Sequence, residues 1–214
     1  MDLLGILISY LFIGCIIVAS KWFERFSKEA SRKFIHIVLC NWFIVAMFVF
    51  ESVWYAMFVP ATFVIINFLS AKYNLIPSME RDEDEGYGTV YYALSLAILV
   101  GLTFGYVNQP WIGAIGILIM GYGDGLAAIV GKAMPYKPYQ VFGSRKTVSG
   151  SLVMWVCSFL ISWVFFSIYT STLGLIEALV VASVATVLEA ISPKGLDNLF
   201  VPIGCSTLVY MLFI

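Results

Sequence analysis

The sequence has few charged residues. Asp, Glu, Lys and Arg make up 12% of its 214 residues, whereas 61% are hydrophobic. About 25% charged residues is usual for a soluble domain, so the composition excludes an ordinary soluble enzyme and indicates a membrane protein. The chain has one histidine, and its four cysteines form no CxxC pair. We therefore expect neither a disulfide framework nor a zinc site, and the cysteines are predicted to pack inside apolar segments.

A soluble nucleotide-binding fold is also missing. The hydrophilic connections are each shorter than about 20 residues, which leaves no room for a Rossmann or P-loop domain. The nearest approach to a P-loop runs from Gly125 to Gly131-Lys132-Ala133. It has the wrong glycine spacing and no Ser or Thr after the lysine. Any nucleotide site must therefore be built from helix ends and short loops.

The chain contains instead about eight apolar stretches, each long enough to cross ~30 Å of hydrocarbon as a helix. We expect an all-α, polytopic membrane protein with a single transmembrane catalytic domain over residues 1–214. The first stretch lacks the basic start and the small-residue cleavage pattern of a secretory signal, so it is predicted to stay as an anchor. The stretches cover residues 3–20, 34–50, 53–70, 89–107, 111–131, 151–170, 172–191 and 198–214.

Lys and Arg are absent from the predicted connections on one side of the membrane. With an even number of spans, both termini share that side, and all twelve Lys and Arg residues can be placed on the other. Short cytoplasmic loops are enriched in these residues, so we expect the charged side to be cytoplasmic and the termini non-cytoplasmic. The acidic segment Glu80–Glu85 on the charged side is interpreted as a solvated loop.

Two polar segments precede predicted spans on the charged side. In residues 31–37, helical spacing puts Arg32, Lys33 and the single imidazole of His36 close enough to meet one ligand. A basic flank with an interfacial histidine explains this segment equally well. In residues 86–92, glycines precede Thr89, a predicted N-cap whose helix start could face an anion. Capping without a ligand is the alternative there.

Asp124 stands inside the fifth apolar stretch, eight residues before Lys132 and thus ~12 Å from the predicted cytoplasmic end. A carboxylate at mid-bilayer costs about 2.5–3.5 kcal/mol on insertion scales and indicates a functional site. Close helix packing accounts for Gly121 and Gly125, four residues apart, but it does not require an aspartate. Because Asp124→Asn removes the charge, we expect that variant to fold at least as stably as the parent.

Two more segments flank later spans. Residues 143–151 combine Arg145 and Lys146 with hydroxyls and glycines at a helix start, which are the donors that a polyphosphate needs. A basic loop with serine capping is the alternative. Residues 189–202 put Glu189 and Asp197 on either side of a Pro/Gly turn, where they could hold magnesium or act as a general base. A tight loop with one capping aspartate is the alternative.

Five motifs therefore occur in order between Ser31 and Pro202. They are Arg32-Lys33-x-x-His36, Gly88-Thr89, Gly123-Asp124-Gly125-x-Ala127-Ala128-x-x-Gly131, Lys146-Thr147-x-x-Gly150-Ser151, and Glu189 followed by Asp197-Asn198-Leu199-x-x-Pro202. This series resembles the family of dolichol kinases, phytol kinases and CTP-dependent diacylglycerol kinases. One departure is Ser149, where the family commonly has an acidic residue, so no carboxylate role is assigned there.

The resemblance implies a membrane enzyme that uses CTP and a divalent cation such as Mg²⁺ to phosphorylate a lipid alcohol at the cytoplasmic face. The acceptor would be a polyprenol, a phytol-like alcohol or diacylglycerol. Asp124 and Asp197 would hold the metal, and Glu189 or one of the aspartates would be the base. The expected catalytic set is Asp124, Lys146, Glu189, Asp197 and His36. The expected nucleotide- and phosphate-binding set is Arg32, Lys33, Thr89, Gly123, Gly125, Arg145, Thr147, Gly150, Ser151 and Asn198.

Two other functions compete with this one. The segments around Asp124 and Lys146 are also similar to those of CTP:phosphatidate cytidylyltransferases, which make a CDP-activated lipid. A transporter would need polar residues through both halves of the bilayer. Only Asp2, Glu51 and Glu177 are charged in the far half, which disfavours a conduit. The expected partners are a membrane lipid alcohol and a nucleoside triphosphate, with no nucleic acid.

Overall fold

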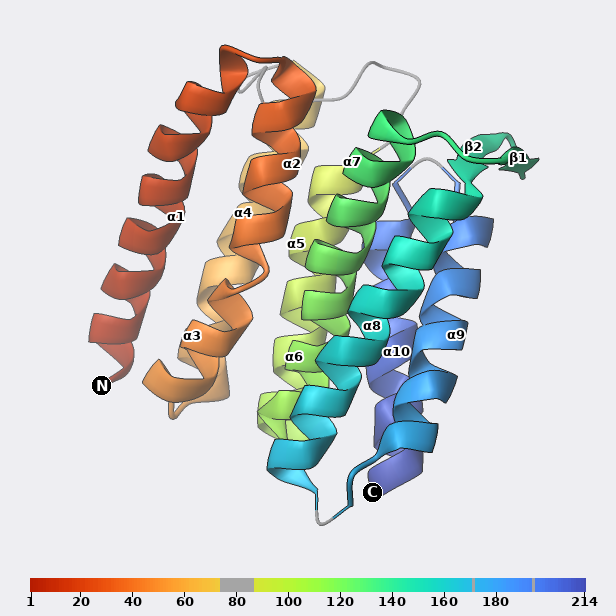
Figure 1. The fold of residues 1–214 in the computed structure, drawn as a ribbon. Helices are drawn as coiled ribbons and strands as arrows, with labels where there is room; N and C mark the ends of the chain where they lie inside the picture. The colour runs from red at the N-terminus through yellow and green to blue at the C-terminus, as the bar shows by residue number, and fades with distance from the viewer. Residues whose placement is uncertain (74–86, 171, 194) are drawn as a thin grey trace.

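The computed structural model describes residues 1–73, 87–170, 172–193 and 195–214. These residues form an all-α bundle whose helices run side by side, with both termini at the same end (Figure 1). The acidic segment Glu80–Glu85 lies outside the described residues. The helices are α1 (Asp2–Glu24), α2 (Lys28–Leu39), α3 (Trp42–Val49), α4 (Val53–Tyr73), α5 (Gly88–Val100), α6 (Pro110–Leu118), α7 (Gly125–Ala133), α8 (Val148–Tyr169), α9 (Leu175–Ile191) and α10 (Asp197–Phe213), with π-helical segments η2 (Gly101–Tyr106) and η3 (Ile119–Asp124).

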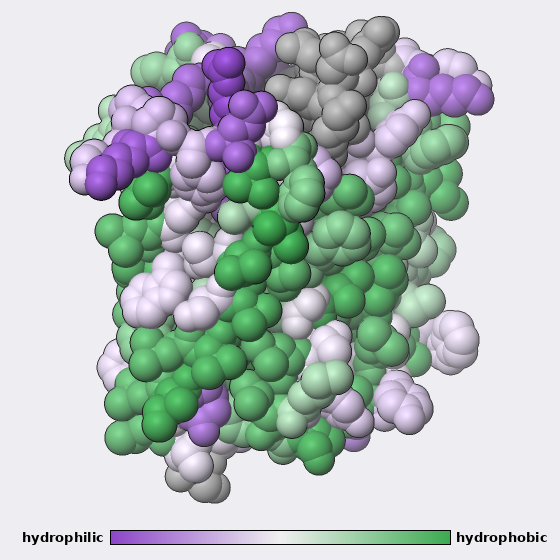
Figure 2. Space-filling view, turned by 90° about the vertical axis from the view of Figure 1, so that its right-hand side faces the viewer, coloured by the Kyte–Doolittle hydropathy of each residue, from purple (hydrophilic) through white to green (hydrophobic). Residues whose placement is uncertain are grey.

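The fold confirms a polytopic membrane protein. Each predicted apolar stretch is mainly helical, and the second is divided between α2 and α3. Within the described ranges, six helical segments are long and apolar enough to cross a bilayer. The helices α9 and α10 are shorter, with 17 residues each. Apolar side chains cover most of the flank of the molecule, and hydrophilic residues gather mainly at one end (Figure 2). The count of eight crossings stays a prediction.

A short β-hairpin between α7 and α8 was not anticipated from the sequence. Strands β1 (Pro138–Val141) and β2 (Ser144–Thr147) pair antiparallel, with Tyr139 opposite Lys146. The two turn residues, Phe142 and Gly143, have φ angles of 45° and 84°, the left-handed backbone that tight two-residue hairpins require. The strands are too short and too exposed to show a hydrophobic alternation. The hairpin carries Lys146 to the charged end of the bundle.

The central span consists of α6, η3 and α7, and its helical winding changes to π at Ile119–Asp124. A π-helical turn widens the helix by one residue and is found frequently at functional sites. The segment ends at Asp124, whose side chain is buried. The change in winding therefore occurs directly before the intramembrane carboxylate.

Glycines on the central span let other helices come unusually close. A Cβ atom on Gly116 would lie 2.3 Å from the backbone carbonyl oxygen of Pro202 in α10. Added Cβ atoms on Gly121, Gly123 and Gly125 would lie 2.4, 2.5 and 2.4 Å from side-chain atoms of Cys40, Met154 and Ile37, respectively. Without side chains at these positions, α2, α8 and α10 pack directly on the central backbone.

We expect Gly116→Ala to destabilise the protein by about 1–3 kcal/mol, because the new methyl group meets a carbonyl oxygen that cannot rotate away. Thermal unfolding in detergent measures the change. Gly14→Ala in α1 is the matched control, since nothing lies within 4 Å of a Cβ at that position. Equal melting temperatures for the two variants would contradict the close packing of α6 on α10.

Candidate functional site

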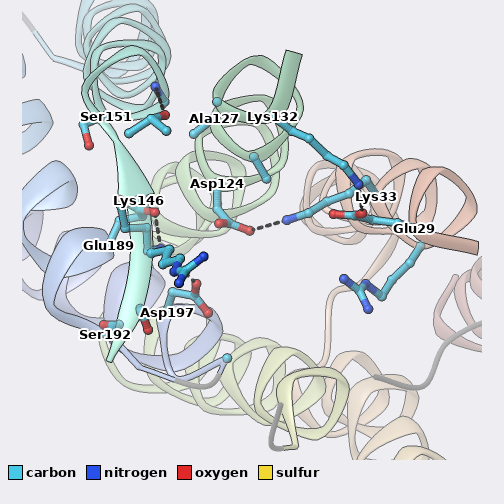
Figure 3. A pocket seen from close by; sticks show the side chains of 18 of the residues that line it. Glu29, Lys33, Asp124, Ala127, Lys132, Lys146, Ser151, Glu189, Ser192 and Asp197 are labelled. Carbon is cyan, nitrogen blue, oxygen red and sulfur yellow. Dashed lines mark hydrogen bonds and ion pairs between the residues drawn. The ribbon is translucent and has the colours of Figure 1, made fainter. Parts of the chain in front are cut away.

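A cavity of about 560 Å³ opens at the charged end of the bundle, between α2, α7, the hairpin, α8 and the α9–α10 connection (Figure 3). Its volume lies within the usual range for small-molecule sites. Five cationic side chains and four carboxylates line it. These are Arg32, Lys33, Lys132, Arg145 and Lys146, with Glu29, Asp124, Glu189 and Asp197.

On one wall, Asp124 is held by two groups from α2. Lys33 Nζ lies 3.1 Å from Asp124 Oδ2, and the two residues are only 7% and 5% exposed. His36 Nε2 lies 3.4 Å from the same oxygen and 3.3 Å from the carbonyl oxygen of Met120. Both neighbours accept hydrogen bonds, which indicates that Nε2 carries the proton. Two donors thus fix the orientation of the Asp124 carboxylate.

On the opposite wall, Lys146 of β2 joins two carboxylates. It forms an ion pair with Glu189, and its Nζ lies 3.9 Å from Asp197 Oδ2. Burial by itself lowers the pKa of Lys146, but the neighbouring carboxylates outweigh it and raise that pKa above its ordinary value. Lys146 is therefore a cation at neutral pH. Figure 3 shows Asp124 between Lys33 on one side and Lys146 on the other.

The start of α8 forms a third part of the wall. Thr147 is the N-cap residue of α8, and its hydroxyl accepts a hydrogen bond of 3.1 Å from the backbone N–H of Gly150. A Cβ atom on Gly150 would lie 2.9 Å from the carbonyl oxygen of Ala127, so glycine is needed where α8 meets α7. The amides and hydroxyls of this helix start, Ser151 among them, line the cavity and favour an anion there.

The donor set also fits a hard divalent cation that is shared with a ligand. Within the described ranges, no group of three His, Cys, Asp or Glu side chains is placed to hold a metal alone. Magnesium usually takes one or two protein carboxylates together with substrate phosphates. The Oε2 atom of Glu189 is buried and has no hydrogen-bond partner among the described atoms, so it is available to a ligand. The cavity can therefore bind a metal-polyphosphate.

The structure brings most of the predicted site residues together. The main cavity is lined by Asp124, Lys146, Glu189, Asp197, Arg32, Lys33, Arg145, Thr147, Gly150 and Ser151. A second cavity of about 60 Å³ is lined by His36, Thr89 and Asn198, and it shares Arg32 and Lys33 with the first. The predicted residues thus divide between two adjoining spaces.

Three of the predictions need correction. Thr89 is not an N-cap, because α5 begins one residue earlier, at Gly88, with Tyr87 as its N-cap. Gly123 and Gly125 are not among the residues that line either cavity. They pack against Met154 and Ile37, so their effect on the site is to bring the neighbouring helices close to Asp124.

An ion pair at the cavity wall was missed from the sequence. Lys132 Nζ of α7 lies 2.5 Å from Glu29 Oε2 of α2; the Lys132 side chain is largely exposed and that of Glu29 is partly exposed. Glu29 stands three residues before Arg32 and four before Lys33, so helical spacing could have placed it on the same face. Nothing in the sequence shows that α7 packs beside α2, which is what puts Lys132 there.

Comparison with known proteins finds several phytol kinases among the chains that are similar to this one. The chain is 36% identical over 205 residues to the phytol kinase of Synechocystis sp., covering 93% of this chain and 87% of that protein. It is 32% identical over 214 residues to the chloroplastic phytol kinase 1 of Arabidopsis thaliana, covering 87% of this chain and 67% of that protein. A probable chloroplastic phytol kinase 2 of Glycine max is 29% identical over 201 residues, covering 87% and 66%. No family model and no solved structure matches the chain.

The buried ion pair changes what we expect of Asp124→Asn. From the sequence alone the variant should be at least as stable as the parent, but it leaves the Lys33 cation buried opposite a neutral amide. We now expect a loss of about 3–5 kcal/mol in unfolding free energy. Combining Asp124→Asn with Lys33→Met should restore most of that stability, because no unpaired charge remains. Thermal unfolding in detergent measures both variants.

Turnover distinguishes a catalytic Asp124 from a structural one. If the carboxylate acts in the site, the single and double variants should both lose at least ~10²-fold in turnover, the usual effect of removing one electrostatic catalytic group. A stable double variant with near-parental turnover would show that Asp124 serves only to neutralise Lys33.

Proposed function

This chain belongs to the phytol kinase family, and we propose on that basis that it transfers the γ-phosphate of CTP to the hydroxyl of a phytol-like alcohol. The family relation makes the protein a phosphotransferase acting on a lipid alcohol. CTP as the donor rests on the motif series and on a cavity with five cations and four carboxylates. The observation that carries the proposal is that four of the five motifs, far apart in the sequence, contribute lining residues to this one cavity.

In the proposed reaction, the acceptor oxygen forms a bond to the γ-phosphorus while the bond from that phosphorus to the β-phosphate oxygen breaks, releasing CDP. The hydroxyl proton passes to one of the cavity carboxylates. Such transfers have loose transition states, so catalysis consists mainly of positioning and charge neutralisation. Lys146 and Arg145 neutralise phosphate oxygens on one wall, and Arg32 and Lys33 do so on the other.

Magnesium, when bound with the nucleotide, would supply positive charge against the charge that develops on the leaving group. Asp124, Asp197 and Glu189 are the carboxylates that would hold it, and those not bound to metal remain to accept the proton. The ammonium of Lys146 lies beside both the Glu189 and the Asp197 carboxylates and so holds them on one wall of the cavity.

The reaction is proposed to take place at the cytoplasmic face. The described Lys and Arg side chains lie in segments at the end of the bundle that holds the cavity, opposite the two termini (Figure 1). The positive-inside bias would place that end in the cytoplasm. The hydrocarbon part of the alcohol stays in the bilayer, so only its hydroxyl has to reach the nucleotide.

The proposal is tested by incubating the purified protein with magnesium, a lipid alcohol and CTP that carries ³²P at either the α or the γ position. We expect the lipid product to carry label from γ-labelled CTP and none from α-labelled CTP. Transfer of α-label would identify a cytidylyltransferase instead. Labelling by γ-ATP in place of γ-CTP would overturn the choice of donor.

Lys146→Ala should raise the apparent KM for the nucleotide by at least ~10-fold, since a charge-assisted contact to phosphate contributes about 1.5–3 kcal/mol. The KM for the alcohol should change little. Lys137→Ala is the matched control, because Lys137 precedes the same hairpin and is not among the residues that line the cavity. Unchanged nucleotide kinetics in a folded Lys146→Ala protein would remove Lys146 from the site.

A further inference from the structure

The second cavity adjoins the proposed nucleotide site. It shares Arg32 and Lys33 with the main cavity, and it is also lined by His36, Asn67 and Asn198. Its volume of about 60 Å³ equals the space of roughly two water molecules. A hydroxymethyl group fits such a space, whereas a nucleotide does not.

Asn198 presents an unused hydrogen-bond acceptor at this small cavity. Asn198 is only 4% exposed, and its Nδ2 donates a hydrogen bond of 2.9 Å to the carbonyl oxygen of Gly88. Since only the NH₂ group can donate to a carbonyl, this bond fixes which end of the amide is Oδ1. Oδ1 is buried and has no hydrogen-bond partner among the described atoms. A buried acceptor without a donor costs about 1–3 kcal/mol, so a ligand hydroxyl would be favoured there.

An apolar crevice continues from the small cavity. The two spaces share Ile35, Leu39, Asn67 and Tyr92 as lining residues. Apart from Asn67 and Tyr92, the crevice is lined by apolar side chains. The surroundings are thus charged in the main cavity, polar in the small cavity and apolar in the crevice. This is the order of phosphate, hydroxyl and hydrocarbon tail when a lipid alcohol lies beside a nucleotide.

The crevice lies beside helix α1. It is bounded by α1, α2, α4 and α5 through residues such as Ile13, Val59 and Ala93. Helix α1 packs on α2, α3 and α4 and stands at the edge of the molecule (Figure 1). The free space is narrow, about 30 Å³, so a chain enters only as α1 and its neighbours part. A single chain needs less opening than the two acyl chains of diacylglycerol.

We propose that the small cavity and the crevice form the acceptor site for a single-chain isoprenoid alcohol, an assignment that rests on the proposed kinase function. The hydroxyl donates a hydrogen bond to Asn198 Oδ1, and the tail lies between α1, α2, α4 and α5. This contact turns an oxygen lone pair toward the neighbouring nucleotide cavity. In a loose transition state the proton leaves late, so it stays hydrogen-bonded to Asn198 Oδ1 while the new P–O bond forms and then passes to a cavity carboxylate. Thr89 and Asn198 then belong to the alcohol site, and no longer to the nucleotide site.

Asn198→Ala tests the hydroxyl contact. We expect kcat/KM for phytol to fall at least ~10-fold, while the dissociation constant for magnesium-CTP, measured by direct binding, stays within about 2-fold. Asn108→Gly is the control. Asn108 is an exposed asparagine in the connection before α6, at the other end of the bundle. A loss of CTP affinity as large as the loss in kcat/KM would return Asn198 to the nucleotide site and overturn this part of the proposal.

Ala93→Phe tests the crevice, because Ala93 is buried and the larger side chain fills the space beside it. Phosphorylation of a C20 alcohol should fall at least ~10-fold relative to a C5 alcohol of the same head group. Ile65→Phe on the exposed face of α4 is the control. Equal effects of Ala93→Phe on both chain lengths would overturn the assignment of the crevice.

A third measurement does not depend on folding of a variant. Phytol with a photoactivatable diazirine at the far end of its chain should label peptides of α1 or α4 in the parent protein, and unlabelled phytol should compete. Labelling confined to α8 and α9 would overturn the proposed tail site even if the alcohol is phosphorylated. Competed labelling of α1 without any phosphorylation would uphold the tail site and contradict the kinase function instead.

Discussion

The buried ion pair between Lys33 and Asp124 is the interaction on which the site depends. Each charge alone would be costly away from water, but together with His36 they form a hydrogen-bonded group between α2 and the central span. The pair fixes the position of α2 relative to η3. It therefore orders one wall of the main cavity and, through His36, one wall of the smaller cavity beside it.

Close packing of the central span makes this pairing possible. The π-helical winding of η3 ends at Asp124, and glycines on either side of the aspartate admit Ile37 of α2 and Met154 of α8. Small residues are a common means of bringing helices together in membranes, where the hydrophobic effect does little to drive helix association. The glycines flanking Asp124 thus act on chemistry indirectly, by setting the distance from α2 to the carboxylate.

The arrangement also brings charged, polar and apolar spaces together within one small bundle. Charged residues gather where the helix ends meet the hairpin, and the spaces become progressively apolar toward α1. An enzyme that transfers phosphate from a water-soluble nucleotide to a membrane alcohol needs both environments in contact. The boundary between them is formed by Arg32 and Lys33 on one turn of α2 and by Asn198 at the start of α10.

The sequence by itself determined the class of protein, because hydrophobic stretches of membrane length and an intramembrane aspartate follow from composition and order alone. It also predicted most of the residues that line the main cavity, since Asp124, Lys146, Glu189 and Asp197 stand out against an apolar background. Only the tertiary structure decided that Lys33 neutralises Asp124, that Lys132 meets Glu29, and that Gly123 and Gly125 pack against other helices. The physical reason is that these facts depend on which helices are neighbours, and neighbours in a membrane bundle are chosen by close packing between surfaces far apart in the chain.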